Sequence, residues 1–354
     1  AGYAETVAER IRTVLLEPFV TRGRTFATRA SIGIATFPQD GANAKDLLKS
    51  ADIALYRAKA EGRNRFVTYS PGLRAAVEDR IALVEDVRRA LRAGEIVPFY
   101  QPKVSLASGG IVGFEALARW HHPQRGLLTP ASFGVAFEDP ELSRALGGQI
   151  LERVVADMRR WLDQGLPPVQ VAINVSPAEF SDRRLASAIK EALARCSIPT
   201  ASIEVEITEA VFLDQMLADV VATLEDLHAA GFSIALDDFG TGYASLSHLK
   251  AFPINHIKID KGFIQEIERG EADEAIVSAV IHLGHRMKMQ ITAEGVETLS
   301  QAIRLQELGC DNAQGYLYAT AMSSPDAAAF LARLPRQEGR VIPASAWPAA
   351  FTGS

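Results

Sequence analysis

Apolar residues recur with two different spacings at the start of the chain. Residues 4–16 and 44–61 show the helical spacing of three and four, and Gly62, a residue typical of helix ends, follows the second segment. Residues 27–37 and 65–69 are rich in β-branched and aromatic residues and alternate in part, which predicts strands. The pattern therefore predicts a small α/β unit, followed by a further helix over residues 73–92.

From Ile96 onward short β-branched segments alternate with helical ones, and several of the helices end at a glycine. The clearest predicted strands are residues 169–175, 203–207, 232–236, 256–259, 289–293 and 313–317, and the clearest helices are residues 214–230, 273–287 and one opened by a Thr298–Gln301 capping box. Such alternation indicates a parallel sheet. The repeat number over roughly 240 residues favours a closed (β/α)₈ barrel of the TIM type over an open, doubly wound sheet.

These patterns divide the chain into four parts. We expect a partial α/β domain at residues 1–70, a linking helix at 71–94, the barrel at 95–335 and a loosely attached tail at 336–354. The fold class is thus α/β, a TIM-type barrel preceded by a truncated α/β fragment. Because the chain lacks an initiator methionine and opens inside a predicted helix, we expect it to be a piece of a longer protein.

Composition restricts the possible partners. Of 354 residues, 48% are hydrophobic and 23% charged, which is typical of globular chains, and the formal net charge is −6. This balance disfavours nucleic-acid and anionic-membrane binding, which need a basic surface. We find no membrane segment and no secretory leader, and the two cysteines, Cys196 and Cys310, are far apart. We therefore expect a cytoplasmic protein without disulfides.

Polar side chains lie at or near the ends of nearly all the apolar strands. They are Glu115, Asn174, Glu206, Glu209, Asp237, Asp238, Lys258, Asp260, Glu294, Glu297 and Gln314. Any one of them could simply be a solvated strand end or a helix cap. In a barrel, however, the carboxyl ends of the strands meet at one mouth, so the repetition predicts a single shared site.

The charges of this predicted site require cations. Glu115, Glu206, Asp237, Asp238 and Glu294 bring five negative charges and Lys258 brings one positive charge, so two divalent ions would neutralise the set. Oxygen ligands without nearby cysteine or histidine favour Mg²⁺ or Mn²⁺ over Zn²⁺. Two such ions form the usual clamp for in-line displacement at phosphorus. The residues alone thus predict a two-metal site for phosphoryl transfer or hydrolysis.

Eight motifs then carry a resemblance to a known family. They are Tyr100-Gln101-Pro102, Glu115-Ala116-Leu117-Ala118-Arg119-Trp120, Ile173-Asn174-Val175-Ser176, Glu206-Ile207-Thr208-Glu209, Asp237-Asp238-Phe239-Gly240-Thr241-Gly242-Tyr243, Lys258-Ile259-Asp260, Ala293-Glu294-Gly295-Val296-Glu297 and Gln314-Gly315-Tyr316. Over residues 80–335 the sequence resembles the EAL-domain family of cyclic di-GMP phosphodiesterases. The resemblance implies a modified TIM barrel that hydrolyses 3′,5′-cyclic di-GMP to linear 5′-pGpG with Mg²⁺ or Mn²⁺, by in-line attack of a metal-bound water.

The resemblance also implies roles for individual residues. Glu115, Asn174, Glu206 and Asp237 would hold one metal ion, and Asp237 would bridge to a second ion that Asp238 also binds. Glu294 would act through a metal-bound water, and Lys258 would face the attacked phosphate or that water. Ca²⁺ is expected to bind and inhibit, because its longer and looser coordination spoils the two-ion clamp.

Other positions match substrate and loop residues of the family. The resemblance implies contacts to substrate from Gln101, Arg119, Leu117, Asp260, Gln314 and Tyr316. Glu209 and Glu297 would stabilise loops, and the loop at residues 237–243 would contribute to a homodimer.

The start of the chain resembles a second family. Three segments are similar to the C-terminal half of a GGDEF domain, the diguanylate cyclase module. They are Ser31-Ile32-Gly33-Ile34-Ala35, Ala51-Asp52-Ile53-Ala54-Leu55-Tyr56-Arg57-Ala58-Lys59 and Gly62-Arg63-Asn64-Arg65. The signature loop of that module is not in this sequence. We therefore expect no cyclase activity and no specific GTP site here, and a strand at 27–37 without sheet neighbours.

Two other functions remain as alternatives at this point. One is a catalytically silent cyclic di-GMP receptor that signals through its dimer surface; receptors of that kind typically lose metal ligands, and none is lost here. The other is a Mg²⁺-dependent barrel enzyme for a different substrate, such as one that forms an enolate. It would explain the acidic residues but not Gln101, Arg119 and the Asp237–Tyr243 loop together.

Overall fold

The computed structural model describes residues 2–21, 24–26, 28–62, 64–180, 184–209, 211, 217–240, 246–268 and 270–333. Three predicted segments lie outside this description. They are the tail at 336–354, the first residues of the helix 214–230 and residues 241–243 of the loop motif. The chain divides into two compact units, Ala1–Asp86 and Val87–Ser354, and the division falls inside one helix.

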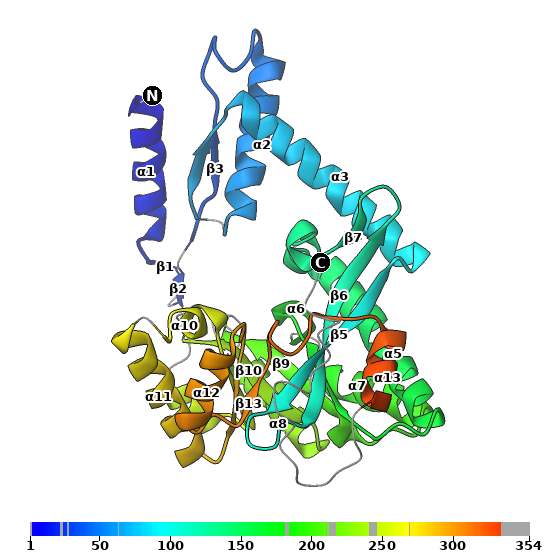
Figure 1. Cartoon of the computed structure of the whole chain (residues 1–354). Helices are drawn as coiled ribbons and strands as arrows, with labels where there is room; N and C mark the ends of the chain where they lie inside the picture. The colour runs from blue at the N-terminus through cyan, green and yellow to red at the C-terminus, as the bar shows by residue number, and fades with distance from the viewer. Residues whose placement is uncertain are drawn as a thin grey trace. The chain divides into compact units, whose positions relative to one another are not determined.

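The first unit contains the predicted helices and a small parallel strand pair. Its elements are α1 (Gly2–Leu16), β1 (Phe19–Thr21), β2 (Arg24–Phe26), β3 (Ile32–Ile34), α2 (Ala44–Ala60), β4 (Phe66–Thr68) and the beginning of α3 (Pro71–Ala93) (Figure 1). The predicted strand 27–37 is shorter than expected, and the expectation that it lacks sheet neighbours is wrong, because β3 pairs in parallel with β4. The crossover through α2 returns the chain beside β3, as in other β–α–β units.

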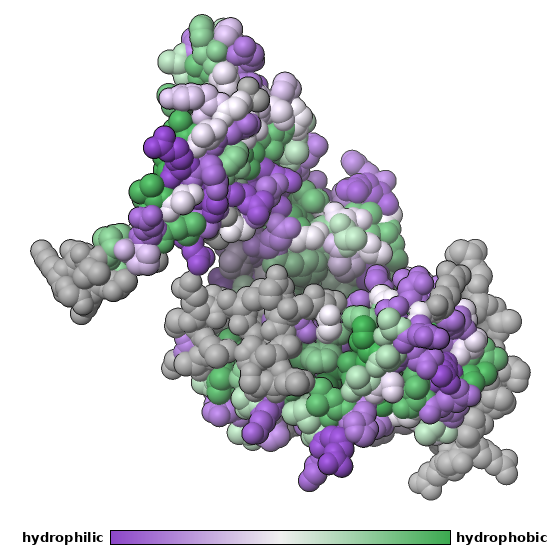
Figure 2. All heavy atoms as spheres, turned by 90° about the vertical axis from the view of Figure 1, so that its left-hand side faces the viewer, coloured by the Kyte–Doolittle hydropathy of each residue, from purple (hydrophilic) through white to green (hydrophobic). Residues whose placement is uncertain are grey.

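This unit buries few apolar side chains. Ala8, Ile34, Ala54, Ala58 and Val77 are buried, whereas Tyr3 of α1 is 86% exposed. Figure 2 shows hydrophobic residues interspersed with hydrophilic ones on the visible face of the unit. Its apolar core is therefore thin, and small units of this kind gain little stability from burial.

The second unit is built on a closed barrel of eight strands, which confirms the predicted fold class. The strands follow one another around the barrel in the order β6 (Ile111–His122), β8 (Gln170–Asn174), β9 (Ile203–Thr208), β10 (Ser233–Phe239), β11 (His256–Ile259), β12 (Gln290–Ala293), β13 (Asn312–Ala313) and β5 (Ile96–Ser105), and β7 (Gly126–Leu128) adds to the side of β6. The pairing of β5 with β6 closes the ring, which an open sheet would not do.

One strand departs from the parallel arrangement that the alternation predicted. β5 is antiparallel to both β6 and β13, while the other seven barrel strands are parallel. The reason is the connection: a short turn at residues 106–110, not a helix, joins β5 to β6. A short turn can join only antiparallel neighbours.

Helices cover the outside of the barrel. They are α4 (Val135–Glu138), α5 (Pro140–Asp163), α6 (Pro177–Phe180), α7 (Leu185–Arg195), α8 (Leu217–Ala229), α9 (Leu246–Ala251), α10 (Lys261–Gln265), α11 (Glu271–Arg286), α12 (Leu299–Glu307) and α13 (Ser324–Arg333), with single 3₁₀ turns at Pro130–Ser132 and Thr200–Ser202 (Figure 1). α5 packs on β5 and β8, and α11 packs on β11 and β12. Leu146, Ile150 and Val154 show the helical spacing of the buried face of α5. None of the described helices is both long and apolar enough to cross a bilayer.

The predicted helix ends are found where the sequence placed them. Gly231 and Gly309 follow α8 and α12 with φ angles of +86° and +85°, a conformation that glycine adopts without strain. The Thr298–Gln301 capping box is present, with both reciprocal hydrogen bonds.

The last predicted strand is wrong over most of its length. Residues 313–317 were expected to be extended, but β13 ends at Ala313 and the chain then turns. The turn follows Val296: Val296 N donates to the Gln314 carbonyl at 3.0 Å, and Leu317 N donates to the Val296 carbonyl at 3.0 Å. Gly315 passes so close to this backbone that a Cβ would lie 2.1 Å from the Val296 carbonyl oxygen.

The capping box generates a stability prediction. Thr298→Ala should lower the free energy of unfolding of the barrel by about 1 kcal/mol, because the N-terminal amides of α12 lose an acceptor. Urea denaturation followed by tryptophan fluorescence would measure it, since Trp120 and Trp161 both lie in the barrel. Ser300→Ala, at an exposed position of the same helix, is the matched control; an equal loss in both variants would contradict the capping role.

Candidate active site

The site lies inside the barrel and is built from residues that alternate along the strands. Glu204 and Glu206 are two residues apart on β9, and His256 and Lys258 are two residues apart on β11, so each pair shares one face of its strand. Inside the barrel, Glu204 contacts His256 and Glu206 contacts Lys258. Both glutamates also contact Lys103 of β5. In each pair, the residue nearer the C-terminal end of its strand belongs to the candidate active site; these residues are Glu206 and Lys258.

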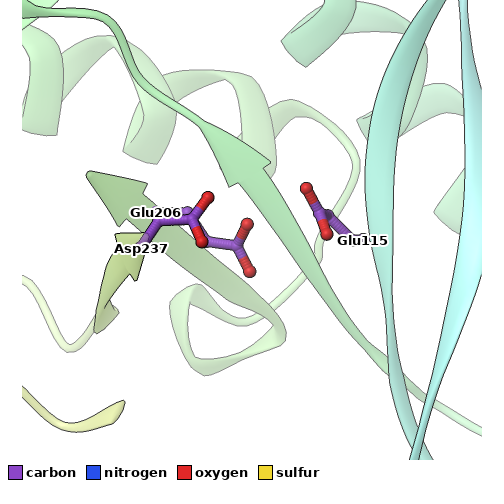
Figure 3. Close-up of side chains that lie close together, drawn as sticks. All are labelled: Glu115, Glu206 and Asp237. Atoms are coloured by element: carbon purple, nitrogen blue, oxygen red, sulfur yellow. The ribbon is translucent and has the colours of Figure 1, made fainter. Parts of the chain in front are cut away.

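The ammonium of Lys258 lies at the centre of four carboxylates. Its Nζ is 2.6 Å from Glu294 Oε1, 2.8 Å from Glu206 Oε2, 3.1 Å from Asp237 Oδ1 and 3.3 Å from Glu115 Oε2. Lys258 itself is 1% exposed. Figure 3 shows Glu115 on one side of a common space, with Glu206 and Asp237 on the other. The structure thus brings together residues from five predicted strand ends.

These four carboxylates and that of Asp238 form two groups that fit divalent ions. Ligand oxygens of Glu115, Glu206 and Asp237 lie within 4.8 Å of one another, and so do those of Asp237, Asp238 and Glu294. Asp237 belongs to both groups, which is the arrangement expected of a bridging ligand. The donors are all oxygens, and such ligand sets suit Mg²⁺ or Mn²⁺. The residues present therefore fit the two ions that the sequence predicted.

A β-bulge brings Asp237 and Asp238 to the same group. Neighbouring residues on a strand face opposite ways, so two consecutive aspartates should not share one ion. On β10, however, the register with β11 shifts between Leu236 and Phe239, and Asp238 has a φ of +54°. The extra residue and the left-handed backbone turn the side chain of Asp238 toward Glu294.

The charges of the site act strongly on one another. Burial alone would lower the pKa of Lys258, but Glu115, Glu206, Glu294 and Asp237 raise it well above its ordinary value. Burial opposes the ionisation of Glu115, yet Lys258 and hydrogen bonds from Asn174 and Gln314 outweigh it and lower the pKa to about 2. Lys258 is therefore a permanent cation, and Glu115 a permanent anion, in the metal-free chain.

Other carboxylates show the opposite shift. Burial and the charge of Glu115 raise the pKa of Glu206 well above its ordinary value. Burial, with the charges of Asp237 and Glu115, raises the pKa of Glu294 to about 8, and burial with Asp237 raises that of Asp238. One ammonium does not compensate all these carboxylates. The site therefore favours additional positive charge.

Three predicted amides lie around Glu115. Asn174 Nδ2 donates to Glu115 Oε1 at 2.8 Å, and Gln314 Nε2 donates to Glu115 Oε2 at 2.7 Å. Gln314 Nε2 also lies 3.1 Å from Gln101 Oε1, and Gln101 Nε2 donates to the Ala319 carbonyl. The network fixes the orientation of Glu115 and brings Gln101, from the antiparallel strand β5, into the site.

The remaining predicted substrate residues lie at different depths. Arg119 and Leu117 are half-buried on β6, and burial lowers the pKa of Arg119 while the Glu115 carboxylate and Tyr316 oppose this. Asp260 caps α10 through its Oδ1, which accepts from Gly262 N at 2.9 Å. Tyr316 is 63% exposed. Asp260 is not among the carboxylate groups that could hold an ion in the described part of the chain.

The two predicted loop residues differ in their surroundings. Glu209 is 3% exposed, and its Oε1 accepts from Gly240 N at 3.1 Å, directly after the bulge that carries Asp237 and Asp238. Glu297 is exposed, and its backbone amide, not its side chain, bonds to Gln301. Glu209 thus contacts the loop that it was expected to hold.

A cavity of about 780 Å³ opens beside Glu115. Its lining includes Leu117 and Asn174, apolar residues of α5 and α7 such as Leu146 and Ile189, and charged residues of the same helices, Arg144 and Glu191. A mostly apolar cavity with a few polar groups in its lining is typical of sites for organic ligands.

A second charged layer, which the sequence patterns did not predict, lies beneath the site. Lys103 on β5 contacts Glu204 and lies 3.4 Å from Glu206 Oε1, and His256 contacts the other oxygen of Glu204. The signal was the period of two: Lys103 follows Gln101 by two residues, and Glu204 precedes Glu206 by two.

The chain is similar to known proteins over most of its length. Residues 84–321 match the EAL domain family, and residues 1–65 match the diguanylate cyclase, GGDEF domain. The chain is 39% identical to the bifunctional diguanylate cyclase/cyclic di-GMP phosphodiesterase MucR of Pseudomonas aeruginosa, over 90% of this chain and 46% of that protein. It is 34% identical to the cyclic di-GMP phosphodiesterase PdeR of Escherichia coli, over 90% of this chain and 48% of that protein. The chain thus spans about half the length of these relatives.

Solved structures agree with the fold. The PaMucR phosphodiesterase in its c-di-GMP complex is 40% identical and superposes with a TM-score of 0.66, covering 70% of this chain and 99% of that one. The EAL enzyme Bd1971 with cAMP and cyclic di-GMP bound is 30% identical, with a TM-score of 0.69, covering 72% of this chain and 70% of that one.

Proposed function

This chain belongs to the EAL domain family, and we propose that its barrel, residues 95–335, hydrolyses 3′,5′-cyclic di-GMP to linear 5′-pGpG with Mg²⁺ or Mn²⁺. Two of its relatives are named cyclic di-GMP phosphodiesterases, and one related structure is a c-di-GMP complex. We assign no reaction to residues 1–70, the partial GGDEF-like domain.

The observation that carries the proposal is the pair of carboxylate groups that share Asp237. When bound there, two divalent ions would activate a water and neutralise the phosphodiester under attack. The chain's own residues hold the ligands in place: Asn174 and Gln314 orient Glu115, and the bulge on β10 orients Asp238.

Lys258 supplies a fixed positive charge next to the reacting phosphate or water. Its high pKa makes it a poor proton acceptor, since a base must lose its proton near the working pH. Glu294 lies 2.6 Å from Lys258 Nζ and in one group with Asp237 and Asp238, where it would position the attacking water. We therefore assign charge stabilisation to Lys258 and positioning of the water to Glu294.

Substrate would lie across the barrel mouth. Gln101 and Arg119 would bind it near the carboxylates, with Leu117, Asp260, Gln314 and Tyr316 around them, and the adjoining cavity would take apolar parts of the nucleotide. A homodimer through the barrel belongs to the proposal. The loop that would contribute to it includes residues 241–243, outside the described part of the chain.

The proposal predicts metal-dependent turnover. Incubated with cyclic di-GMP, the chain should form 5′-pGpG in Mg²⁺ or Mn²⁺ but not in Ca²⁺ alone or after chelation. Mass spectrometry of the product, with liquid chromatography for the rate, provides the measurement. Asp237→Asn, which removes the shared charge, should lower the rate by roughly 100-fold or more. Equal product formation in Ca²⁺ and Mg²⁺ would rule out the two-ion account, and tight binding without product in any metal would favour the silent receptor.

Charge stabilisation by Lys258 makes a second prediction. Lys258→Ala should lower kcat by roughly 100-fold or more, as for other preorganised electrostatic groups, because no cation faces the phosphate or water. Raising the pH should not restore the rate, which a pH–rate profile between pH 6 and 10 would test. If the rate of the variant rose in parallel with hydroxide concentration, Lys258 would instead be the proton acceptor.

The contact of Glu209 with the loop makes a third prediction. Glu209→Ala should lower kcat by roughly 10- to 100-fold, because the Asp237–Asp238 bulge loses its support at Gly240. Mn²⁺ affinity, measured by calorimetry, should fall much less than in Glu206→Ala. A loss of affinity as large as in Glu206→Ala would show that Glu209 acts as a ligand.

A further inference from the structure

A buried charged layer lies below the candidate active site and has no part in the proposed chemistry. It contains Lys103 of β5, Glu204 of β9 and His256 of β11. Lys103 is 4% exposed and Glu204 is 1% exposed. The interiors of TIM-type barrels are usually filled with branched apolar side chains, so a lysine–glutamate pair at this depth needs a reason.

The contacts of this layer lead upward to a candidate metal ligand. Lys103 Nζ contacts Glu204 Oε1 and lies 3.4 Å from Glu206 Oε1. The second oxygen of Glu204 contacts His256 Nδ1 and accepts from Ser233 Oγ at 3.4 Å. Glu204 is thus held on both oxygens, and it fixes the position of Lys103.

Glu206 is consequently held from two sides. Lys103 approaches its Oε1, and Lys258 lies 2.8 Å from its Oε2. Glu204 and Glu206 share one face of β9, and without Lys103 their carboxylates would repel each other across the interior. Lys103 engages Oε1 of Glu206, whereas Oε2 lies beside the Lys258 ammonium, which Glu115 and Asp237 also contact.

Stability alone does not explain the pair. Replacing a buried ion pair by apolar residues is often neutral or stabilising, because desolvation of the two charges offsets their attraction. Partners that orient metal ligands, in contrast, commonly affect metal affinity strongly.

We propose that Lys103 is a positioning residue that, anchored by Glu204, fixes Oε1 of Glu206 so that Oε2 faces the cation. The inference rests on the proposed function, in which Glu206 is a metal ligand. It extends that function to a residue outside the ligand set.

The experiment is a Mn²⁺ titration of the full chain, stripped of metal with a chelator, by calorimetry. Lys103→Met should weaken Mn²⁺ binding by roughly 10-fold, the lower end of the range for such partners. The double variant Lys103→Met/Glu204→Gln carries the same loss at Glu206 but leaves no unpaired charge in this layer. Because it leaves the net charge of the layer unchanged, its affinity should also be weaker than that of the natural chain.

The double variant decides between positioning and charge balance. If it binds Mn²⁺ as the natural chain does, Lys103 only compensates Glu204 and the proposal is overturned. If Lys103→Met fails to fold because Glu204 is left unpaired, the double variant still gives the answer. Tyr100→Phe is the matched control: it removes a buried hydrogen bond to Asp157 from the opposite face of β5 and should leave Mn²⁺ affinity unchanged.

Two further measurements separate this inference from the proposed function. If the natural chain binds no Mn²⁺, or if Glu206→Ala binds it equally well, the proposed metal site fails. If Glu206→Ala loses binding while both Lys103 variants keep it, only the positioning role fails.

Discussion

Like charges buried at one barrel mouth are the constraint on which the rest of this structure depends. Four carboxylates lie within 3.3 Å of the Lys258 ammonium, and a single cation cannot compensate them in a medium that solvates charge poorly. The raised pKa values of Glu206 and Glu294 express this imbalance. Amides hold Glu115 in place and the bulge on β10 brings Asp237 and Asp238 together, and both features keep these charges in one arrangement.

The direction of β5 determines which residues reach the mouth and which lie below it. On the parallel strands, residues later in the sequence lie nearer the mouth, so Glu206 is in the site and Glu204 beneath it. β5 runs the other way, so Gln101 is in the site and Lys103 beneath it. A single reversed strand therefore supplies a lysine to the lower layer and a glutamine to the upper one.

Much of the fold and of the site could be predicted from local patterns. The alternation with a period of two predicts β11 correctly, and the helical spacing with its terminal glycines predicts α2 and α12. The polar residues at the strand ends predict that Glu115, Glu206, Asp237 and Glu294 are neighbours. These features depend on residues close together in sequence and on one topological rule.

What could not be predicted depends on contacts between distant segments. The turn after Ala313 forms because its backbone bonds to Val296, and the partnership of Lys103 with Glu204 needs the register of an antiparallel strand. The β3–β4 pairing likewise depends on the crossover through α2. Local periodicity indicates which residues share one face of a strand, but it does not indicate which segments pair with one another.

The structure bears local energetic costs at the site itself. Asp238 has a left-handed backbone, which costs an L residue of this kind of order 1 kcal/mol. Among the described residues, Gln314 Oε1 is buried without a hydrogen-bond partner, a further cost of roughly 1–3 kcal/mol. Asp238 and Gln314 both lie at the group of carboxylates, and burial opposes the ionisation of these carboxylates. Since a bound cation would offset the buried negative charge, these local costs are of the kind expected where a site is arranged to bind charge.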